Sequence, residues 1–216
     1  MSENKKLVIW GAGTIGELAH YYFSNDSDYE VIGFTEGDEM SIASQSFLNK
    51  PLYKWSEVTK LFGPDEVDIF IAIGAKKGNQ FRRQRFDQAR ASGYRMATYI
   101  SSKATNFSKK IGDNCFVLEN NVLQPFTEVE DCVTMWSGNH IGHHSIIKQN
   151  CFICSHVVIS GKCVVGSNSF IGVNATIHDG GEIGAFSIVG AGSIVTTSCE
   201  DMSVFRPNKT ESKVIK

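Results

Sequence analysis

The sequence lacks both an excess of one charge sign and a long hydrophobic run. Lys and Arg number 21 and Asp and Glu 23, which gives a net charge of −2. Proteins that bind nucleic acids or anionic membranes usually carry blocks of basic residues. This chain has no long run of one charge sign, so neither partner is expected. The apolar run LVIW near the N-terminus ends at a glycine turn and is too short for a signal peptide or a membrane span. We therefore expect a cytoplasmic protein.

The six cysteines are too few and too scattered to define the fold. In a cytoplasmic chain they argue against a disulfide framework and against a zinc ribbon. A repeat in the second half explains most of them. From Ile111 to Val195 every sixth residue is aliphatic or Met, at fifteen consecutive positions. Neither an α-helix nor a β-strand has this period.

The residue four places after each member of this series is mostly small. Four cysteines take this position, namely Cys115, Cys151, Cys163 and Cys199. An inward aliphatic residue and a small corner residue in every hexad are typical of a parallel β-helix. In that fold three hexads form one triangular coil, and side chains stack roughly every eighteen residues. We expect the four cysteines to be packing residues without a redox or metal role.

The first half alternates strand and helix patterns. KLVIWGAGTIGELAHYYF (6–23) predicts a strand, a GxGxxG turn and a helix whose N-terminus can hold a phosphate. The next strand leads to Glu36, twenty residues after Gly16, a spacing that suits a ribose-binding acid. Further elements complete a small doubly wound sheet with room for one mononucleotide: a strand over 67–74, a helix over 79–93 and a last strand over 94–100.

Two of these features have an alternative interpretation. The glycines of the GxGxxG turn could serve a tight strand-to-helix turn that binds nothing. The basic residues Arg82, Arg83 and Arg85 fit a solvated helix face better than a phosphate clamp.

A Rossmann-like α/β domain followed by an all-β left-handed parallel β-helix resembles one family. The chain is similar to the hexapeptide-repeat nucleotide-sugar N-acyltransferases, relatives of bacillosamine and perosamine N-acetyltransferases, and to the sialic acid O-acetyltransferases. The similarity is carried by GAGTIG, VIGFTE, VDIFIAIG, the hexad array and VFRPNK near the C-terminus. It implies a nucleotide-sugar-binding domain over 1–104, an acyltransferase β-helix over 105–200 and a C-terminal tail over 201–216.

The resemblance also implies the reaction and its setting. We expect an acyl-CoA-dependent N-acyltransferase, with acetyl-CoA as the expected co-substrate and a nucleotide-linked amino sugar as the acceptor, in O-antigen or lipopolysaccharide biosynthesis. Sugar O-acetylation is the alternative. The family forms a homotrimer with acyl-CoA between neighbouring β-helices, and it needs no permanently bound cofactor and no metal.

The resemblance assigns residues to the two substrates. The nucleotide-sugar residues are Gly11, Gly13, Thr14, Ile15, Thr35, Glu36 and Gly74. The acyl-CoA residues are Gly161, Gly172, Val173, Ala191 and Lys209.

Three histidines lie within five positions, at His140, His143 and His144. Because Ile141 and Ile147 take the inward positions, we expect all three at or beside a corner, outside the core. A gap-free alignment through SFIG (169–172) places His143 on the catalytic histidine of the family. A histidine there can accept the proton of the attacking group near neutral pH. Gly161 stacks over it one coil later and leaves room for a pantetheine arm.

The sequence departs from the family at two positions. His144 stands where a carboxylate commonly follows the catalytic histidine, so we expect His144, Asn139 or a water to assist His143 instead. Ile15 replaces a histidine that contacts the sugar nucleotide in bacillosamine-type enzymes. Both differences leave the sugar, the nucleotide and the acyl chain undetermined.

Three other function classes have to be weighed. A zinc-dependent β-helix enzyme like the gamma-class carbonic anhydrases needs a ligand pair five residues apart, and the histidines here offer none. A non-catalytic scaffold would bind acyl-CoA without transferring the acyl group. An NAD oxidoreductase would need a catalytic substrate domain after the glycine turn, and no such domain is indicated.

Overall fold

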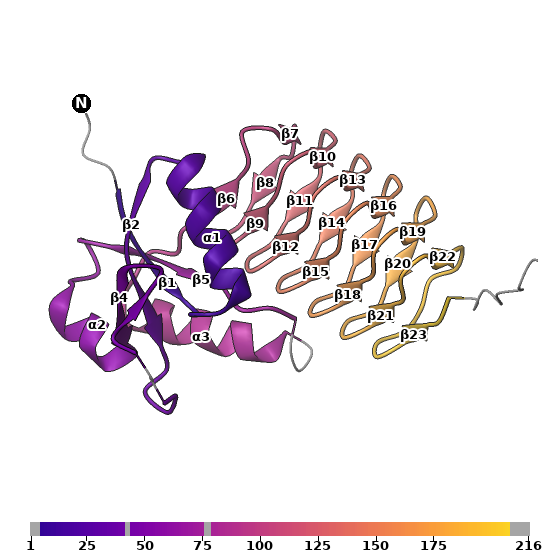
Figure 1. Cartoon of the computed structure of the whole chain (residues 1–216). Coiled ribbons are helices and arrows are strands. Elements are labelled where there is room, and N and C mark those ends of the chain that lie inside the picture. Colours follow the sequence, from indigo (N-terminus) through magenta and orange to yellow (C-terminus); the bar gives the residue numbers. More distant parts are fainter. Residues whose placement is uncertain (1–4, 42–43, 76–78, 208–216) are drawn as a thin grey trace, which may run out of the picture.

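The computed structural model describes residues 5–41, 44–75 and 79–207. An N-terminal α/β unit is followed by a long stack of triangular coils (Figure 1). Among these residues, no helix is long and apolar enough to cross a membrane.

The N-terminal unit is a five-stranded sheet in the order β3-β4-β2-β1-β5, parallel except at the β3–β4 pair. The side chains of β1 alternate between its two faces: Leu7 and Ile9 pack with Phe23 of α1, and Val8 and Trp10 pack with α2 and α3. The elements are β1 (Lys5–Trp10), α1 (Thr14–Asn25), β2 (Tyr29–Glu36), β3 (Ser46–Phe47), β4 (Lys50–Lys54), α2 (Trp55–Leu61), β5 (Asp68–Ile71) and α3 (Gln80–Ala91).

The predicted last strand over 94–100 is only partly formed. Met96 makes a single parallel bridge to Ile69. Tyr99 and Ile100 form β6 (Tyr99–Ile100), which pairs with β9 of the coils and not with the N-terminal sheet. The coil architecture therefore begins before residue 105, and the division of the chain at 104 and 105 stays a prediction.

The coils form three parallel sheets of two-residue strands, in which His140 pairs with Val158 and Val158 with Thr176, one coil apart. The first sheet has β7 (Thr105–Asn106), β10 (Val122–Leu123), β13 (His140–Ile141), β16 (Val158–Ile159), β19 (Thr176–Ile177) and β22 (Ile194–Val195). The second has β8 (Lys110–Ile111), β11 (Glu128–Val129), β14 (Ile146–Ile147), β17 (Val164–Val165) and β20 (Glu182–Ile183). The third continues from β6 with β9 (Phe116–Val117), β12 (Thr134–Met135), β15 (Phe152–Ile153), β18 (Phe170–Ile171), β21 (Ile188–Val189) and β23 (Val204–Phe205).

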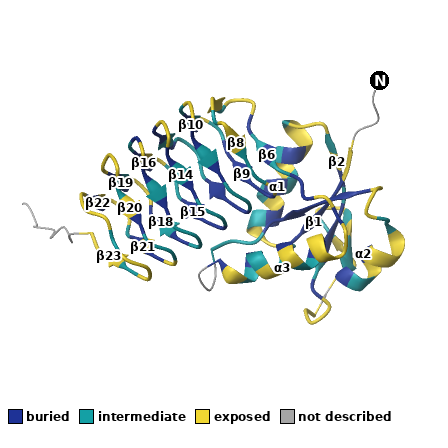
Figure 2. Cartoon of the chain, turned by 180° about the vertical axis from the view of Figure 1, so that it is seen from behind, coloured by how far each residue is buried: buried dark blue, intermediate teal, exposed yellow. Residues whose placement is uncertain are grey.

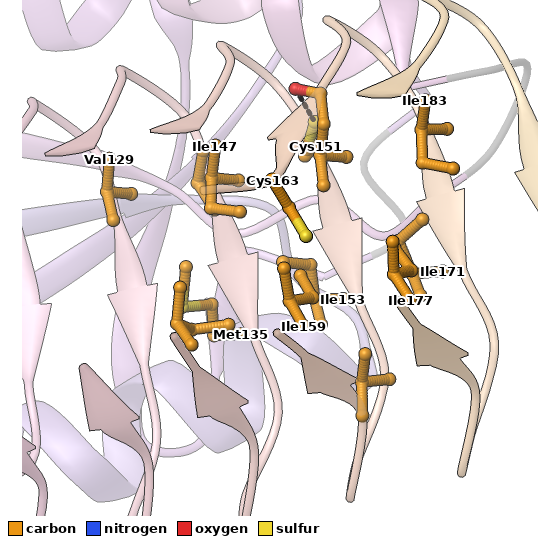
Figure 3. Close-up of a cluster of buried hydrophobic side chains, with 14 of the residues drawn as sticks. Val129, Met135, Ile147, Cys151, Ile153, Ile159, Cys163, Ile171, Ile177 and Ile183 are labelled. Carbon is orange, nitrogen blue, oxygen red and sulfur yellow. Dashed lines mark hydrogen bonds between the residues drawn. The ribbon is translucent and has the colours of Figure 1, made fainter. Parts of the chain in front are cut away.

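The predicted hexad core is confirmed. From Val117 to Val195 every member of the series is at most 2% exposed, and only Ile111, in the first turn, is partly buried. Figure 3 shows a group of these side chains stacked along the inside of the coils, and Figure 2 marks buried residues along the strands of the coils.

The cysteines of the small position pack inside the coils, as predicted. Cys115, Cys151 and Cys163 are fully buried and Cys199 is partly buried, and all are free thiols. Burial raises the pKa of Cys115 and of Cys151 to about 12, so both thiols stay protonated. Cys151 and Cys154 have C-x-x-C spacing, but they are also free thiols and only Cys151 lies in the core.

The expectation of a solvated basic face on α3 is wrong for Arg82. Its side chain is 1% exposed and lies between α3 and the coils. The guanidinium donates to Thr134 Oγ1 (3.0 Å), to Asn150 Oδ1 (3.2 Å) and to the carbonyl oxygens of Asn150 and Cys151. These bonds hold the α/β unit against the β-helix.

Candidate functional site

His143 and His144 form the tight turn between β13 and β14, and both side chains are exposed. His144 adopts the left-handed backbone conformation (φ 61°), which lets the chain turn within two residues. The backbone N–H of His143 donates to Gln124 Oε1 at 2.9 Å, one coil earlier. The backbone of the turn is therefore hydrogen-bonded to the preceding coil, while its two imidazoles face outward.

The two imidazole rings are in contact with each other. Their Nδ1 atoms are 3.1 Å apart and their planes are nearly perpendicular, at 87°. His144 also lies against the Phe126 ring, with centroids 4.7 Å apart. A hydrogen bond between two Nδ1 atoms needs one donor and one acceptor, so at least one ring is neutral. When His143 is neutral and donates from Nδ1, its Nε2 has no hydrogen and can accept a proton.

The structure brings Gly161 to this nitrogen. Gly161 is in the corresponding turn of the next coil, and a Cβ on it would be 2.8 Å from both Nε2 and Cε1 of His143. The absence of a side chain at Gly161 therefore lets the imidazole pack over this position, and the ring fills the space that was expected for a pantetheine arm.

The other predicted residues of this cluster lie elsewhere. His140 is on strand β13, half-buried between Val122 and Val158, so its expected place at a corner is wrong. Asn139 is buried inside the coil, where its Oδ1 accepts from the Val157 N–H (2.8 Å) and its Nδ2 donates to the Trp136 carbonyl. The structure does not bring Asn139 to the His143 ring.

The remaining acyl-CoA residues do not gather around His143. Gly172 and Val173 are in the turn between β18 and β19, and Ala191 is in the stacked turn of the next coil. This turn column runs from the third sheet to the first, whereas His143 is in the column from the first to the second. Lys209 lies outside the described residues.

The residues predicted to bind the nucleotide sugar lie at the carboxyl ends of β1, β2 and β5, where α/β sheets bind ligands. At two of these positions the geometry of the turn requires a glycine. Gly11 has φ +124° and its Cβ position is 2.6 Å from the Ala72 carbonyl oxygen, and a Cβ on Gly16 would collide with the Gly11 carbonyl. Gly13 differs, because nothing lies within 4 Å of its Cβ position. Packing therefore does not require a glycine there.

The neighbours of Gly13 leave an open turn. Helix α1 begins with Thr14 and Ile15. Its N-cap residue is Gly13, so no side-chain hydrogen bond caps the N-terminus of the helix. Gly74 faces Ile15, with its Cβ position 3.7 Å from Ile15 Cγ1. Glu36 reaches back to the turn and accepts from the Ala12 N–H at 2.8 Å. Thr35, by contrast, is fully buried, and its hydroxyl donates to the Tyr53 carbonyl at 3.2 Å, inside the sheet.

No protein-family model matches the chain. Solved structures do. The acetyltransferase domain of PglB from Neisseria gonorrhoeae matches with a TM-score of 0.81 at 23% identity, over 93% of this chain and 96% of that chain. PerB from Caulobacter crescentus, solved with CoA and GDP-perosamine, matches with a TM-score of 0.78 at 20% identity, over 92% of each chain.

WeeI from Acinetobacter baumannii matches with a TM-score of 0.58 at 19% identity, over 93% of this chain and 95% of that chain. These likenesses confirm the predicted fold, a Rossmann-like domain joined to a left-handed parallel β-helix. In the described part of the chain, no group of three or more His, Cys, Asp or Glu side chains is placed to hold a metal ion.

Proposed function

We propose that the protein transfers an acyl group, expected to be acetyl, from acyl-CoA to the amino group of a nucleotide-linked amino sugar. One observation carries the proposal: His143 is exposed and its Nδ1 lies 3.1 Å from His144 Nδ1, which leaves Nε2 as the nitrogen that can take a proton. The fold supports it, because PerB shares that fold and was solved with CoA and a nucleotide-linked amino sugar. We place the reaction in the cytoplasm, in the synthesis of a surface glycan.

The proposed reaction needs one proton acceptor. The amine lone pair forms a bond to the thioester carbonyl carbon, and the C–S bond breaks with its electron pair moving to sulfur. Nε2 of His143 takes the proton that the amine loses and delivers it to the leaving thiolate. The products are an amide and free CoA, and the imidazole returns to its neutral form. His144 keeps Nδ1 of His143 occupied, which orients the base.

Assembly completes the proposed site. His143 and the residues assigned to acyl-CoA at Gly172, Val173 and Ala191 lie on different edges of one β-helix. A neighbouring copy can bring the second edge to the first, and exposed apolar side chains on the outer coil faces, such as Ile194 at 75% and Ile188 at 46%, favour such a contact. We propose a cyclic homotrimer with three equal sites.

Sedimentation equilibrium at micromolar concentration should give about three times the chain mass of 23.8 kDa. A monomer under these conditions contradicts both the trimer and the shared site.

The nucleotide sugar is assigned to the glycine turn, and Gly13 tests this assignment. Replacing Gly13 by Leu should raise the KM for the nucleotide sugar at least tenfold and leave the KM for acyl-CoA nearly unchanged. The new side chain extends into open space and the Gly13 backbone (φ −131°) is ordinary, so folding should be intact. Gly63→Ala, outside the site, is the control. Equal losses for both substrates would contradict the assignment.

The proposed function itself is tested with the purified chain, acetyl-CoA and a panel of nucleotide-linked amino sugars, while CoA release is measured. An active pair identifies the sugar and the nucleotide. Binding of acetyl-CoA without transfer to any acceptor would favour a scaffold.

A further inference from the structure

The turn that contains His143 belongs to a column of stacked turns, and the turns of the next two coils follow it. His143, Gly161 and Asp179 occupy the same position in successive coils, as the register of the first sheet requires. The column is tied by backbone hydrogen bonds, from the Lys162 N–H to the His143 carbonyl (2.8 Å) and from the Gly180 N–H to the Gly161 carbonyl (2.9 Å). The middle member has no side chain, so the outer two face each other.

The side chains of His143 and Asp179 both lie over Gly161. A Cβ on Gly161 would be 2.8 Å from His143 Nε2 and 2.9 Å from Asp179 Oδ1. The base nitrogen and the carboxylate oxygen thus lie close to the same point, over Gly161. Both side chains are exposed at this edge, so a substrate can reach them from solvent.

We propose that Asp179 is the carboxylate that serves His143, taking the role that a residue next in sequence fills in related enzymes. This inference rests on the proposed function. Asp179 faces the nitrogen that takes the proton, so its negative charge stabilises the imidazolium as it forms. Asp179 neither gains nor loses a proton in the step.

The inference also explains why His144 can stand in the usual carboxylate position. His144 holds Nδ1 of His143, whereas Asp179 acts at the opposite nitrogen. One side chain thus orients the base and the other supplies the charge. Asp179 is a positioning and electrostatic residue that acts through His143.

The test is a double-mutant cycle in steady-state or single-turnover transfer from acetyl-CoA to the active amino sugar. Asp179→Asn keeps the size of the side chain and removes its charge, and it should lower kcat by about 10- to 100-fold. The KM for acetyl-CoA and the melting temperature should change little. In the His143→Ala variant the same substitution should have almost no further effect, because the imidazolium it stabilises never forms.

Asp113→Asn is the matched control, since Asp113 is an exposed aspartate in a coil turn on another edge. Near wild-type kcat for Asp179→Asn, or an equal loss with and without His143, overturns the role of Asp179 while the proposed function stands. A wild-type chain that acylates no amino sugar overturns the proposed function, and the role of Asp179 with it.

Discussion

Replacing His143 by alanine is expected to lower kcat by about 10² to 10⁴, which is the usual contribution of a positioned general base. The melting temperature should hardly change, because the His143 side chain is exposed at a turn and contributes nothing to the core. Steady-state transfer kinetics and a thermal melt on the same preparation separate the two effects.

The loss in His143→Ala should shrink as the pH rises. An amine acceptor that is already deprotonated in solution needs no base to become nucleophilic. A hydroxyl acceptor stays protonated throughout the accessible range and gains nothing from the higher pH. The pH dependence of the variant therefore also distinguishes N-acylation from O-acylation.

The other two histidines are the controls. His144→Ala should cost about tenfold, because it removes the partner that orients the ring of His143. His140→Ala should leave kcat near the wild-type value, since His140 lies on strand β13 and not in the turn. A dead His144→Ala variant beside an active His143→Ala variant would contradict the assignment of the base.

The β-helix could be predicted from the sequence because its geometry repeats every six residues. Each inward side chain from Val117 to Val195 is fixed by the same local rule, so one period identifies the whole core. The same rule, applied to strands, would have placed His140. Each two-residue strand ends on its inward residue, so the residue before Ile141 faces outward on a strand and is not at a corner.

Contacts between coils and between domains were harder to predict. The closeness of His143 and Asp179 depends on the absence of one side chain at Gly161, which a period of six does not reveal by itself. A comparison of positions two coils apart could have found it. Gly172 and Ala191 are separated from His143 because their turns lie on a different edge of the triangular coil. The family resemblance assigns these residues to acyl-CoA, but it does not say on which edge of a single chain each one lies.

The spacing of residues in α3 indicates that Arg82 is buried, but the charge of its side chain argues against that interpretation. Arg82, Phe86 and Ala89 are the buried residues of α3, and their spacing of four and three places them on one helix face. A cation on a helix face is expected to be solvated, because isolated charges rarely become buried. Neutral oxygen atoms from the coils, which are distant in sequence, make its burial possible.

Replacing Arg82 by alanine should therefore destabilise the protein more than any other single change to the basic residues of α3. The substitution removes the donor to Thr134 Oγ1, Asn150 Oδ1 and the Asn150 carbonyl oxygen, while the Cys151 carbonyl oxygen keeps its bond from the Thr134 N–H. It also opens a void beside the Phe152 ring, whose centroid lies 5.8 Å from the guanidinium carbon. Unsatisfied buried acceptors and a void together cost about 3 to 5 kcal/mol. For a chain of this size that corresponds to a fall in Tm of roughly 6 to 20 °C.

Arg83→Ala is the matched control, because it removes the same charge from the next position of the same helix. Arg83 is partly exposed, pairs with Asp87 at 2.9 Å and also donates to Gln149 Oε1 of the coils, and partly exposed contacts of this kind contribute about 0.5 to 1 kcal/mol each. Arg82→Lys should resemble Arg82→Ala more than the wild type, since one ammonium group cannot reach the four acceptors that the planar guanidinium joins. Thermal melts of the three variants decide the matter: equal Tm values for Arg82→Ala and Arg83→Ala would mean that Arg82 does not hold the α/β unit against the coils.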